Sequence, residues 1–422
     1  MNSLLRRVAR LYNIQAEYRD GLGKAREPSP EAVLQVLQVL GAPVASLDDL
    51  PDAQRARRQA LWQRALEPVM VTWQSRPLIF RLRLPVELAE APVRYQIILE
   101  NGERLDGQCA NAPSIAPVTQ IIEGVRYVAR QLIIPCAAPL GYHQLRVRVG
   151  ALDLHSRLFA PPLEAYAPAK DAGKRWGIFC PVYALRSQHN WGAGDFADLE
   201  ELIDFTHQAN GNAVATLPLL ANFLDEPFNP SPYAPVSRLF WNELYLDLPR
   251  IPEFAGCPAA QSLLASGEFC REIETARALS LIDYRKVMAL KRQVLETLLQ
   301  SLLAGNSAQR LGFEKFVASH PRTADYAAFR AKVERERQCW PHWRAPGRDA
   351  VLMPEDYDEI ARQYHLYVQW QCAEQIRAIG AKAKALGTPL YLDFPLGVNR
   401  DGYDVWREQQ LFALEVAGGA PP

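Results

Sequence analysis

The sequence has no excess of charge of either sign, because 47 lysine and arginine residues balance 47 aspartate and glutamate residues. Proteins that hold nucleic acid through its phosphates carry clustered basic charge. The balance therefore gives no electrostatic reason to expect a nucleic-acid partner.

Long apolar runs are missing as well. The first residues, MNSLLRRVARLYNIQAEYRD, carry a charge every few positions and lack the apolar stretch of a secretory signal. No later stretch approaches the roughly 20 apolar residues of a membrane span. We therefore expect a cytoplasmic protein without membrane association.

The cysteines form no C-x-x-C pair, although there are seven of them: Cys109, Cys136, Cys180, Cys257, Cys270, Cys339 and Cys372. An odd, scattered set favours free, mostly buried thiols in a reducing compartment over disulfides or a zinc site. No G-x-G-x-x-G or Walker motif follows a strand, and GAGD at Gly192–Asp195 lacks the Lys-Ser/Thr pair of a phosphate loop. This argues against a nucleotide-dependent enzyme, and we expect neither cofactor nor metal.

Residues 1–65 have the pattern of a helical N-terminal segment. Leu4, Leu5 and Val8 share one helical face. Ser29 followed by Pro30 has the form of a capped helix start. Nothing in this segment suggests chemistry.

Residues 66–160 change to a period of two, with Phe80, Leu82 and Leu84 alternating with arginines. Asn101-Gly102 is a strong hairpin signal. About six such strands predict an antiparallel β-sandwich. It is either a glycan-binding module or a scaffold; Trp73, Tyr95, Tyr127 and Tyr142 are the candidate sugar-binding aromatics. We favour the scaffold, since core burial is the usual fate of strand aromatics.

A proline- and alanine-rich linker, Ala160–Arg175, precedes a pattern of strand, loop, helix and strand within residues 161–422. The run Trp176–Tyr183 is short and apolar enough for a strand buried on both faces. Asp195 stands where the cap of the following helix belongs, and a second strand follows at 213–220. Such a βαβ unit implies a parallel sheet covered by helices.

Residues 252–354 predict a mainly helical insertion. Its connector contains Trp340 and Trp343, which could touch a glycan. A long helix over 356–386 follows, with Ile360, Tyr364 and Tyr367 on its inward face, and then a third strand at Pro389–Phe394.

Three motifs carry a family resemblance and occur in the family's order: YALRSQHNWGAGDFADL (183–199), NPSPYAPVSRLFWNELYLDL (229–248) and PLYLDFPLGVNRDGYDVW (389–406). They resemble the four-α-glucanotransferase (amylomaltase) family, glycoside hydrolase family 77, in its longer bacterial form. The resemblance implies a retaining transferase built on a (β/α)8 TIM barrel. It also implies α-1,4-glucans and maltooligosaccharides as substrates.

The resemblance also implies substrate-binding residues. Tyr233 resembles the family's aromatic that stacks on the glucose beside the scissile bond, and Ser231 a neighbouring polar contact. Asp393 resembles a supporting aspartate at the end of a barrel strand. Asn190, Trp191 and Asp195 are further candidates for lining the cleft.

Retaining transfer needs a nucleophilic carboxylate and an acid about 5–5.5 Å apart. In the family these groups come from later strands, and no residue of this chain matches them. Three strands are recognised where a barrel needs eight. We therefore expect an incomplete barrel in an N-terminal portion whose C-terminal half could be separately encoded. The alternative is a non-catalytic maltooligosaccharide-binding or assembly fragment.

Overall fold

The computed structural model describes residues 2–73, 76–112, 118–135, 137–167, 173–305 and 308–416. The chain forms two compact units that divide at residues 172–173. Part of the expected linker (168–172) and the end of the chain (417–422) lie outside the described residues.

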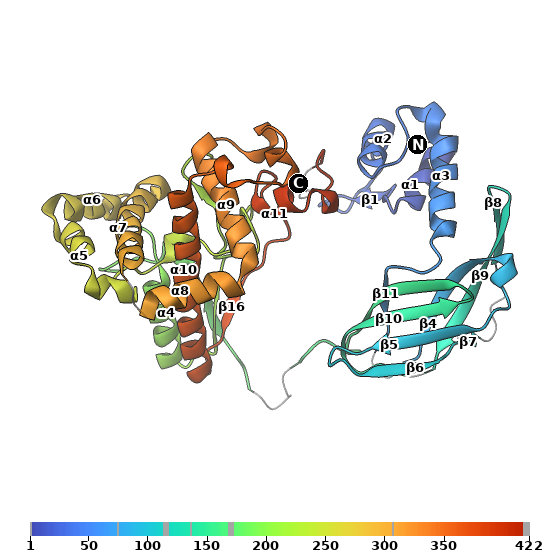
Figure 1. Ribbon diagram of the computed structural model, residues 1–422, viewed down its shortest axis with the longest axis horizontal. Helices are drawn as coiled ribbons and strands as arrows, with labels where there is room; N and C mark the ends of the chain where they lie inside the picture. The colour runs from blue at the N-terminus through green and yellow to red at the C-terminus, as the bar shows by residue number, and fades with distance from the viewer. Residues whose placement is uncertain are drawn as a thin grey trace. The chain divides into compact units, whose positions relative to one another are not determined.

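The first unit begins with three helices, α1 (Ser3–Leu11), α2 (Pro30–Val39) and α3 (Leu50–Gln63), and a two-stranded ribbon of β1 (Tyr18–Arg19) and β2 (Ala25–Arg26) (Figure 1). The helices share a core that includes Leu5, Val8, Leu37 and Leu50. Ser29 caps α2 as the sequence predicts: its hydroxyl accepts a hydrogen bond from the backbone N–H of Ala32 at 3.2 Å.

Two β-sheets follow and pack face to face as a sandwich (Figure 1). One has the strand order β3-β11-β10-β5-β6, and the other joins β4, β9 and β7, with β8 also on β9. Their bounds are β3 Val69–Val71, β4 Leu78–Pro85, β5 Val93–Ile98, β6 Arg104–Gln108, β7 Ala110–Asn111, β8 Val118–Ile122, β9 Val125–Ile134, β10 Gly141–Val149 and β11 Leu152–Ala160. Alternating residues of both sheets, among them Leu82, Leu132, Ile97 and Val147, fill the space between them.

The structure contains the predicted β-sandwich, but the number and direction of its strands differ from the prediction. Gly102 adopts a φ of +89° in the predicted Asn101-Gly102 turn between β5 and β6. Nine strands are described where about six were expected, because strands as short as β7 show no alternation. β3 runs parallel to β11, so the sandwich is not purely antiparallel. Of the four candidate aromatics, Tyr95 is buried, whereas Trp73 and Tyr142 are exposed.

The second unit is built on a three-stranded parallel sheet of β12 (Gly177–Phe179), β13 (Ala213–Thr216) and β16 (Leu390–Leu392), with β13 in the middle. Helix α4 (Phe196–Gln208) joins the first two strands. Ile178, Val214 and Leu390 pair across the sheet on the face where α4 and α10 (Glu359–Ala385) pack (Figure 1).

The opposite face of this sheet is exposed. Phe179 and Tyr391, which lie in the next register row, expose 60% and 69% of their surface. The expectation that Trp176–Tyr183 is buried on both faces is therefore wrong for the described residues. The helices of this unit cover one side of the sheet only.

A block of helices separates β13 from β16: α5 Pro258–Ala265, α6 Gly267–Ala278, α7 Tyr284–Ala304, α8 Ala308–Ser319, α9 Pro321–Glu336 and α10. A short hairpin of β14 (Phe223–Leu224) and β15 (Phe228–Asn229) precedes it, and α11 (Tyr403–Arg407) follows the sheet. Trp340 and Trp343 are buried beside Trp406, which leaves neither free for a glycan. Ile360 is 72% exposed, so its predicted inward position is wrong.

Short 3₁₀ turns complete the chain, at Leu47–Asp49, Val86–Leu88, Val182–Ala184, Glu243–Tyr245, Pro252–Gly256, Trp340–His342, Gly347–Asp349, Pro354–Asp356 and Gln409–Leu411. Across the described residues, each helix is either too short or too polar to span a bilayer. Free thiols are found at Cys180, Cys257, Cys270, Cys339 and Cys372; of these, Cys257 and Cys372 are buried and Cys270 is exposed. The expectation of mostly buried thiols is therefore only partly met.

Candidate functional site

The carboxyl edge of the parallel sheet carries the candidate site. Asp393 directly follows β16, and its backbone N–H donates to the carbonyl of Thr216 at the end of β13, at 3.1 Å. Its carboxylate accepts a hydrogen bond from the N–H of Phe394 at 2.8 Å. The strand ends therefore fix the position of this aspartate.

Tyr233 lies against Asp393, although it comes from the loop after β13. Its side chain is 56% exposed. Desolvation of the phenol and the neighbouring negative charge of Asp393 raise the pKa of Tyr233. The structure thus brings together two residues that the sequence indicated separately. An exposed ring beside a carboxylate suits a ligand with hydroxyl groups and an apolar face.

Ser231 lies two residues before Tyr233, half-buried within the same loop. Its carbonyl accepts a hydrogen bond from Nδ2 of Asn222 at 2.7 Å, and its N–H donates to Oδ1 of Asn229 at 3.2 Å. These contacts hold the backbone from which Tyr233 projects.

The far end of the loop is fastened by Asp404, which lies in α11. The hydroxyl of the fully buried Ser237 donates to Oδ1 of Asp404 at 2.5 Å, and the N–H of Arg238 donates to Oδ2 at 2.8 Å. Asp404 therefore joins the loop after β13 to the segment that follows β16.

Sequence reasoning did not single out Tyr183, which lies near Tyr233, or Tyr284, which contacts Tyr183. The rings of Tyr183 and Tyr284 are 6.2 Å apart at 70°, an edge-to-face contact. Tyr183 also contributes to the raised pKa of Tyr233, after burial and Asp393. Its position just after β12 was the available signal, since loops that follow parallel strands build the functional edge.

The loop between β12 and α4 holds Asn190, Trp191 and Asp195, and all three are buried. Asn190 accepts from the N–H of Gly192 at 3.2 Å and donates to Asp198 at 3.2 Å. Trp191 packs edge-on against Phe269 at 5.6 Å. Their burial argues against direct contact with a ligand and gives them a part in shaping the loop.

Asp195 caps α4 as predicted, in a capping box with Asp198. Its Oδ1 accepts from the N–H of Ala197 at 3.0 Å, while Asp198 accepts from the N–H of Asp195 at 2.8 Å. The glycines of GAGD allow close backbone contact: a Cβ on Gly194 would lie 2.0 Å from the carbonyl oxygen of Val182. The GAGD segment is therefore a tight turn.

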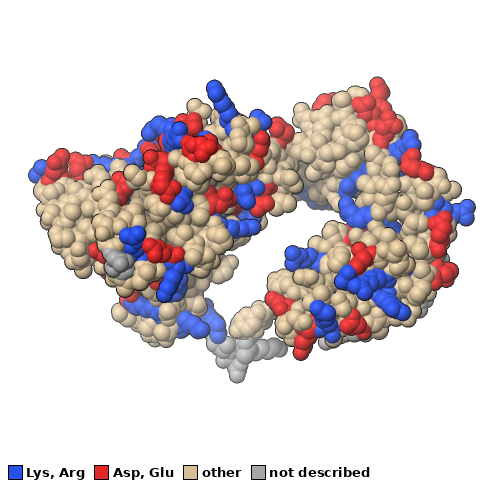
Figure 2. Space-filling model, in the orientation of Figure 1, with Lys and Arg blue, Asp and Glu red and all other residues tan. Residues whose placement is uncertain are grey.

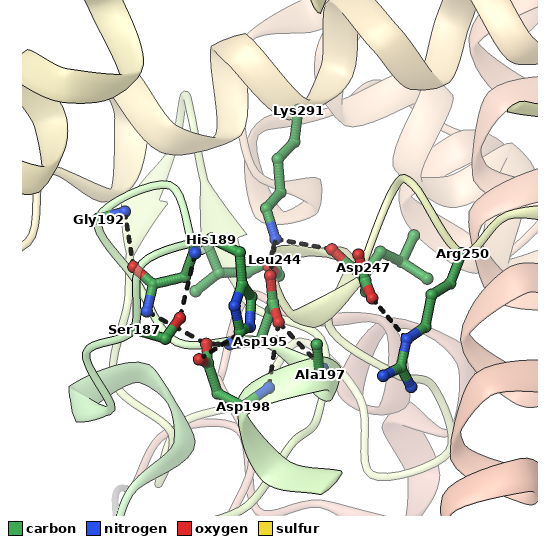
Figure 3. Close-up of polar contacts among 12 residues, drawn as sticks. Ser187, His189, Gly192, Asp195, Ala197, Asp198, Leu244, Asp247, Arg250 and Lys291 are labelled. Atoms are coloured by element: carbon green, nitrogen blue, oxygen red, sulfur yellow. Dashed lines mark hydrogen bonds and ion pairs between the residues drawn. The ribbon is translucent and has the colours of Figure 1, made fainter. Parts of the chain in front are cut away.

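Lys291 of α7 reaches the same loop from the helical block (Figure 3). Only 1% of its side chain is exposed. Its Nζ donates to the carbonyls of Leu244 and Leu246, each at 2.7 Å, and lies 3.6 Å from Oδ2 of Asp195. Burial lowers the pKa of Lys291 and raises the pKa of Asp195, and the attraction between the two charges opposes both shifts.

His189, Asp198 and Glu201 offer ligand atoms within 4.8 Å of one another. The side chain of His189 is 45% exposed. Asp198 is already committed to the N–H of Asp195 and the amide of Asn190. The capping of α4 therefore already uses the carboxylate of Asp198.

Comparison with known proteins places the chain in a family. The model of the 4-alpha-glucanotransferase family matches residues 180–422, and a model described as the MalQ N-terminal beta sandwich domain matches residues 65–162. The first match covers more than half of the chain. The chain belongs to the 4-alpha-glucanotransferase family.

Individual relatives agree with this assignment. A 4-alpha-glucanotransferase of Mycobacterium tuberculosis is 29% identical, with 98% of this chain and 58% of the relative aligned. One from Haemophilus influenzae is 27% identical over 84% of this chain and 52% of its own length. The crystal structure of amylomaltase from Corynebacterium glutamicum superposes with a TM-score of 0.74 at 25% identity, covering 97% of this chain and 56% of that one. The chain thus spans little more than half the length of these relatives.

Proposed function

We propose that this chain carries the glucan-binding part of a 4-α-glucanotransferase, which transfers α-1,4-glucan segments between maltooligosaccharides. The observation that carries the proposal is the pairing of the exposed Tyr233 with Asp393 at the carboxyl edge of the parallel sheet. Membership of the family supports the reaction class.

The proposed domain organisation is a helical segment over 1–65, the sandwich over 66–160 and a barrel portion over 161–422 with a helical insertion at 252–354. Three parallel strands with helices on one face are what an open part of a (β/α)8 barrel would present. The superposition on the Corynebacterium amylomaltase supports this organisation.

Within the site, we propose that the ring of Tyr233 stacks on a glucose unit and that Asp393 binds its hydroxyls. Ser231 would hold the loop and add a polar contact. We assign Asn190, Trp191 and Asp195 a positioning part in the neighbouring loop, because their side chains are buried.

The chemistry requires a carboxylate nucleophile and a carboxylic acid on opposite sides of the glycosidic bond. The acid protonates the leaving oxygen, the nucleophile forms a glycosyl-enzyme, and a sugar hydroxyl then attacks that intermediate. Asp393 lies at a strand end that matches a supporting residue of the family. We therefore propose that the two catalytic carboxylates come from further strands, supplied by a C-terminal half that covers the exposed sheet face around Phe179 and Tyr391.

The free thiols of Cys180, Cys257, Cys270, Cys339 and Cys372 suit a reducing compartment, and a cytoplasmic location is part of the proposal. The alternative function, a non-catalytic maltooligosaccharide-binding or assembly protein, differs only in lacking transfer.

Two measurements test the proposal. Calorimetric titration with maltoheptaose should detect binding to the chain, and Tyr233→Ala should weaken it by about tenfold or more, roughly 1.4 kcal/mol or more. Tyr166→Ala removes a more exposed tyrosine outside the site and should bind like the unchanged chain. Equal binding by both variants would contradict the site. Incubation with maltotriose tests for transfer, which would release glucose.

A further inference from the structure

The outer face of the sandwich holds a large cavity that the proposed function does not use. It has a volume of about 740 Å³ and lies over β5, β6 and the end of β10. Its lining includes Arg94, Gln96, Asp106, Arg146 and Arg148. Small-molecule sites commonly measure about 300–1,000 Å³, so the cavity is large enough for a metabolite.

The strand register concentrates positive charge there. Arg94 pairs directly with Arg148 across β5 and β10, and Arg146 lies two residues before Arg148 on the same face. Like charges directly opposite each other destabilise an antiparallel pair. Figure 2 shows Lys and Arg side chains gathered over this part of the sandwich.

The cavity's arginines are not neutralised equally. Arg146 forms a two-pronged contact with Asp153, in which its Nε lies 2.7 Å from Oδ1. Arg148 reaches the same carboxylate only at 3.7 Å and is 59% exposed. Among the residues that the structure describes, the side chain of Arg94 has no hydrogen-bond or ion-pair partner. The residues Arg94 and Arg148 therefore lie opposite each other. The carboxylate of Asp153, which Arg148 approaches, is already bound by Arg146.

Neutral and acidic groups lie beside these arginines. Nε2 of Gln96 donates to Oδ1 of Asp106 at 2.8 Å, and Gln108 pairs with Arg94 on the other side of β5. Amide and carboxylate groups supply the donors and acceptors that fix hydroxyl groups. Tyr95 and Gly107, which pair across β5 and β6, also line the cavity.

We propose that this cavity binds a small phosphorylated sugar. The phosphate would lie between Arg94 and Arg148, since guanidinium forks bind phosphate oxygens in a two-pronged manner. The sugar hydroxyls would bond to Gln96, Asp106 and Gln108. The site lies in the N-terminal unit, so it would sense a metabolite and not transfer one. This inference does not depend on the proposed transferase activity.

Calorimetric titration of the full 422-residue chain with glucose 1-phosphate tests the proposal, with inorganic phosphate and maltose as the comparison ligands. We expect glucose 1-phosphate to bind, phosphate to bind more weakly, and the affinity for both to fall as salt is raised. Arg94→Gln and Arg148→Gln should each weaken binding at least tenfold. Arg157→Gln, on the same outer face but outside the cavity, should leave it unchanged.

Several results would overturn the proposal. They are no binding of glucose 1-phosphate at millimolar concentration, equal affinity in Arg94→Gln and the unchanged chain, or maltose binding in the cavity as tightly as the phosphorylated sugar. Arg94 is exposed, so its replacement should leave the fold intact, and thermal melting checks this. Shifts of the backbone amide signals of β5 and β10 on titration report the location without any variant.

Discussion

The ammonium group of Lys291 lies 3.6 Å from the carboxylate of Asp195, and both side chains are buried. Lys291 comes from α7 in the helical block, and Asp195 caps α4 beside the parallel sheet. Because Lys291 also donates to the carbonyls of Leu244 and Leu246, one side chain joins three segments around the sheet.

Lys291→Met should therefore lower the stability of the chain. Removal of one partner of a buried ion pair leaves the other charge uncompensated, at a cost of roughly 3–5 kcal/mol. Urea unfolding measures the change. Lys286 lies on the same helix as Lys291 and forms a more exposed ion pair with Glu272 of α6. Lys286→Met should therefore cost about 1 kcal/mol or less.

The double variant Lys291→Met with Asp195→Asn provides the matched control. Asparagine still caps a helix, so the substitution at Asp195 mainly removes charge. We expect the double variant to lose less stability than the sum of the single losses. Additive losses would show that the two charges do not interact.

Glu334 should make the chain sensitive to acid. Desolvation alone would raise the pKa of its carboxyl, but the contacts with His365 and with Arg292, at 2.7 and 2.8 Å, outweigh it and hold the pKa below the usual range. Because the pKa of Glu334 is lower in the folded chain than in the unfolded chain, its ionised carboxylate stabilises the fold at pH values above the unfolded-state pKa, near 4.5. This stabilisation is lost as the pH falls below that value.

Urea unfolding at a series of pH values between about 3 and 7 measures this effect. Glu334→Gln should be less stable than the unchanged chain at pH 7 and should lose less additional stability on acidification. Glu336→Gln, exposed on the same helix, should keep the acid dependence of the unchanged chain. An unchanged slope in Glu334→Gln would contradict the assignment.

Asp404→Ala should loosen the loop that carries Tyr233. The variant leaves the buried hydroxyl of Ser237 and the N–H of Arg238 without their acceptor, at a cost of about 1–3 kcal/mol. Hydrogen exchange should show faster exchange at the amide of Arg238. Asp349→Ala, in an exposed turn, should leave that amide protected.

Tyr391→Lys should leave the stability within about 0.5 kcal/mol, because the side chain is 69% exposed. It should also reduce self-association, since an apolar sheet face with open edges promotes pairing between chains. Val214→Lys, at the fully buried position in the neighbouring row, should unfold the unit. Light scattering and thermal melting distinguish these outcomes.

Local signals in the sequence predicted where helices and strands form better than they predicted which segments pack against them. Ser29 and Asp195 cap their helices because capping depends on neighbouring backbone groups. Burial depends on distant segments: Trp191 lies in a polar loop and meets Phe269 of α6. Lys291 lies at the helical spacing of the buried residues that follow Val287 in α7, and this spacing could have indicated that Lys291 is buried.

The exposed face of the sheet could not be predicted from strand composition. Phe179 belongs to a run that was predicted to be buried on both faces, yet it is exposed, because apolarity shows what a side chain prefers and not whether another layer covers it. The contact between Tyr233 and Asp393 could also not be predicted from the sequence alone. It depends on β13 and β16 being neighbours in the parallel sheet, which the structure shows.

The central claim is that these residues bind α-1,4-glucans at the sheet edge and that catalytic carboxylates must be added to them. The most direct measurement combines maltoheptaose titration with a maltotriose transfer assay on the purified 422-residue chain. We expect binding that depends on Tyr233 and no release of glucose. Transfer at a rate typical of an enzyme, about 1 per second or faster, would contradict the claim.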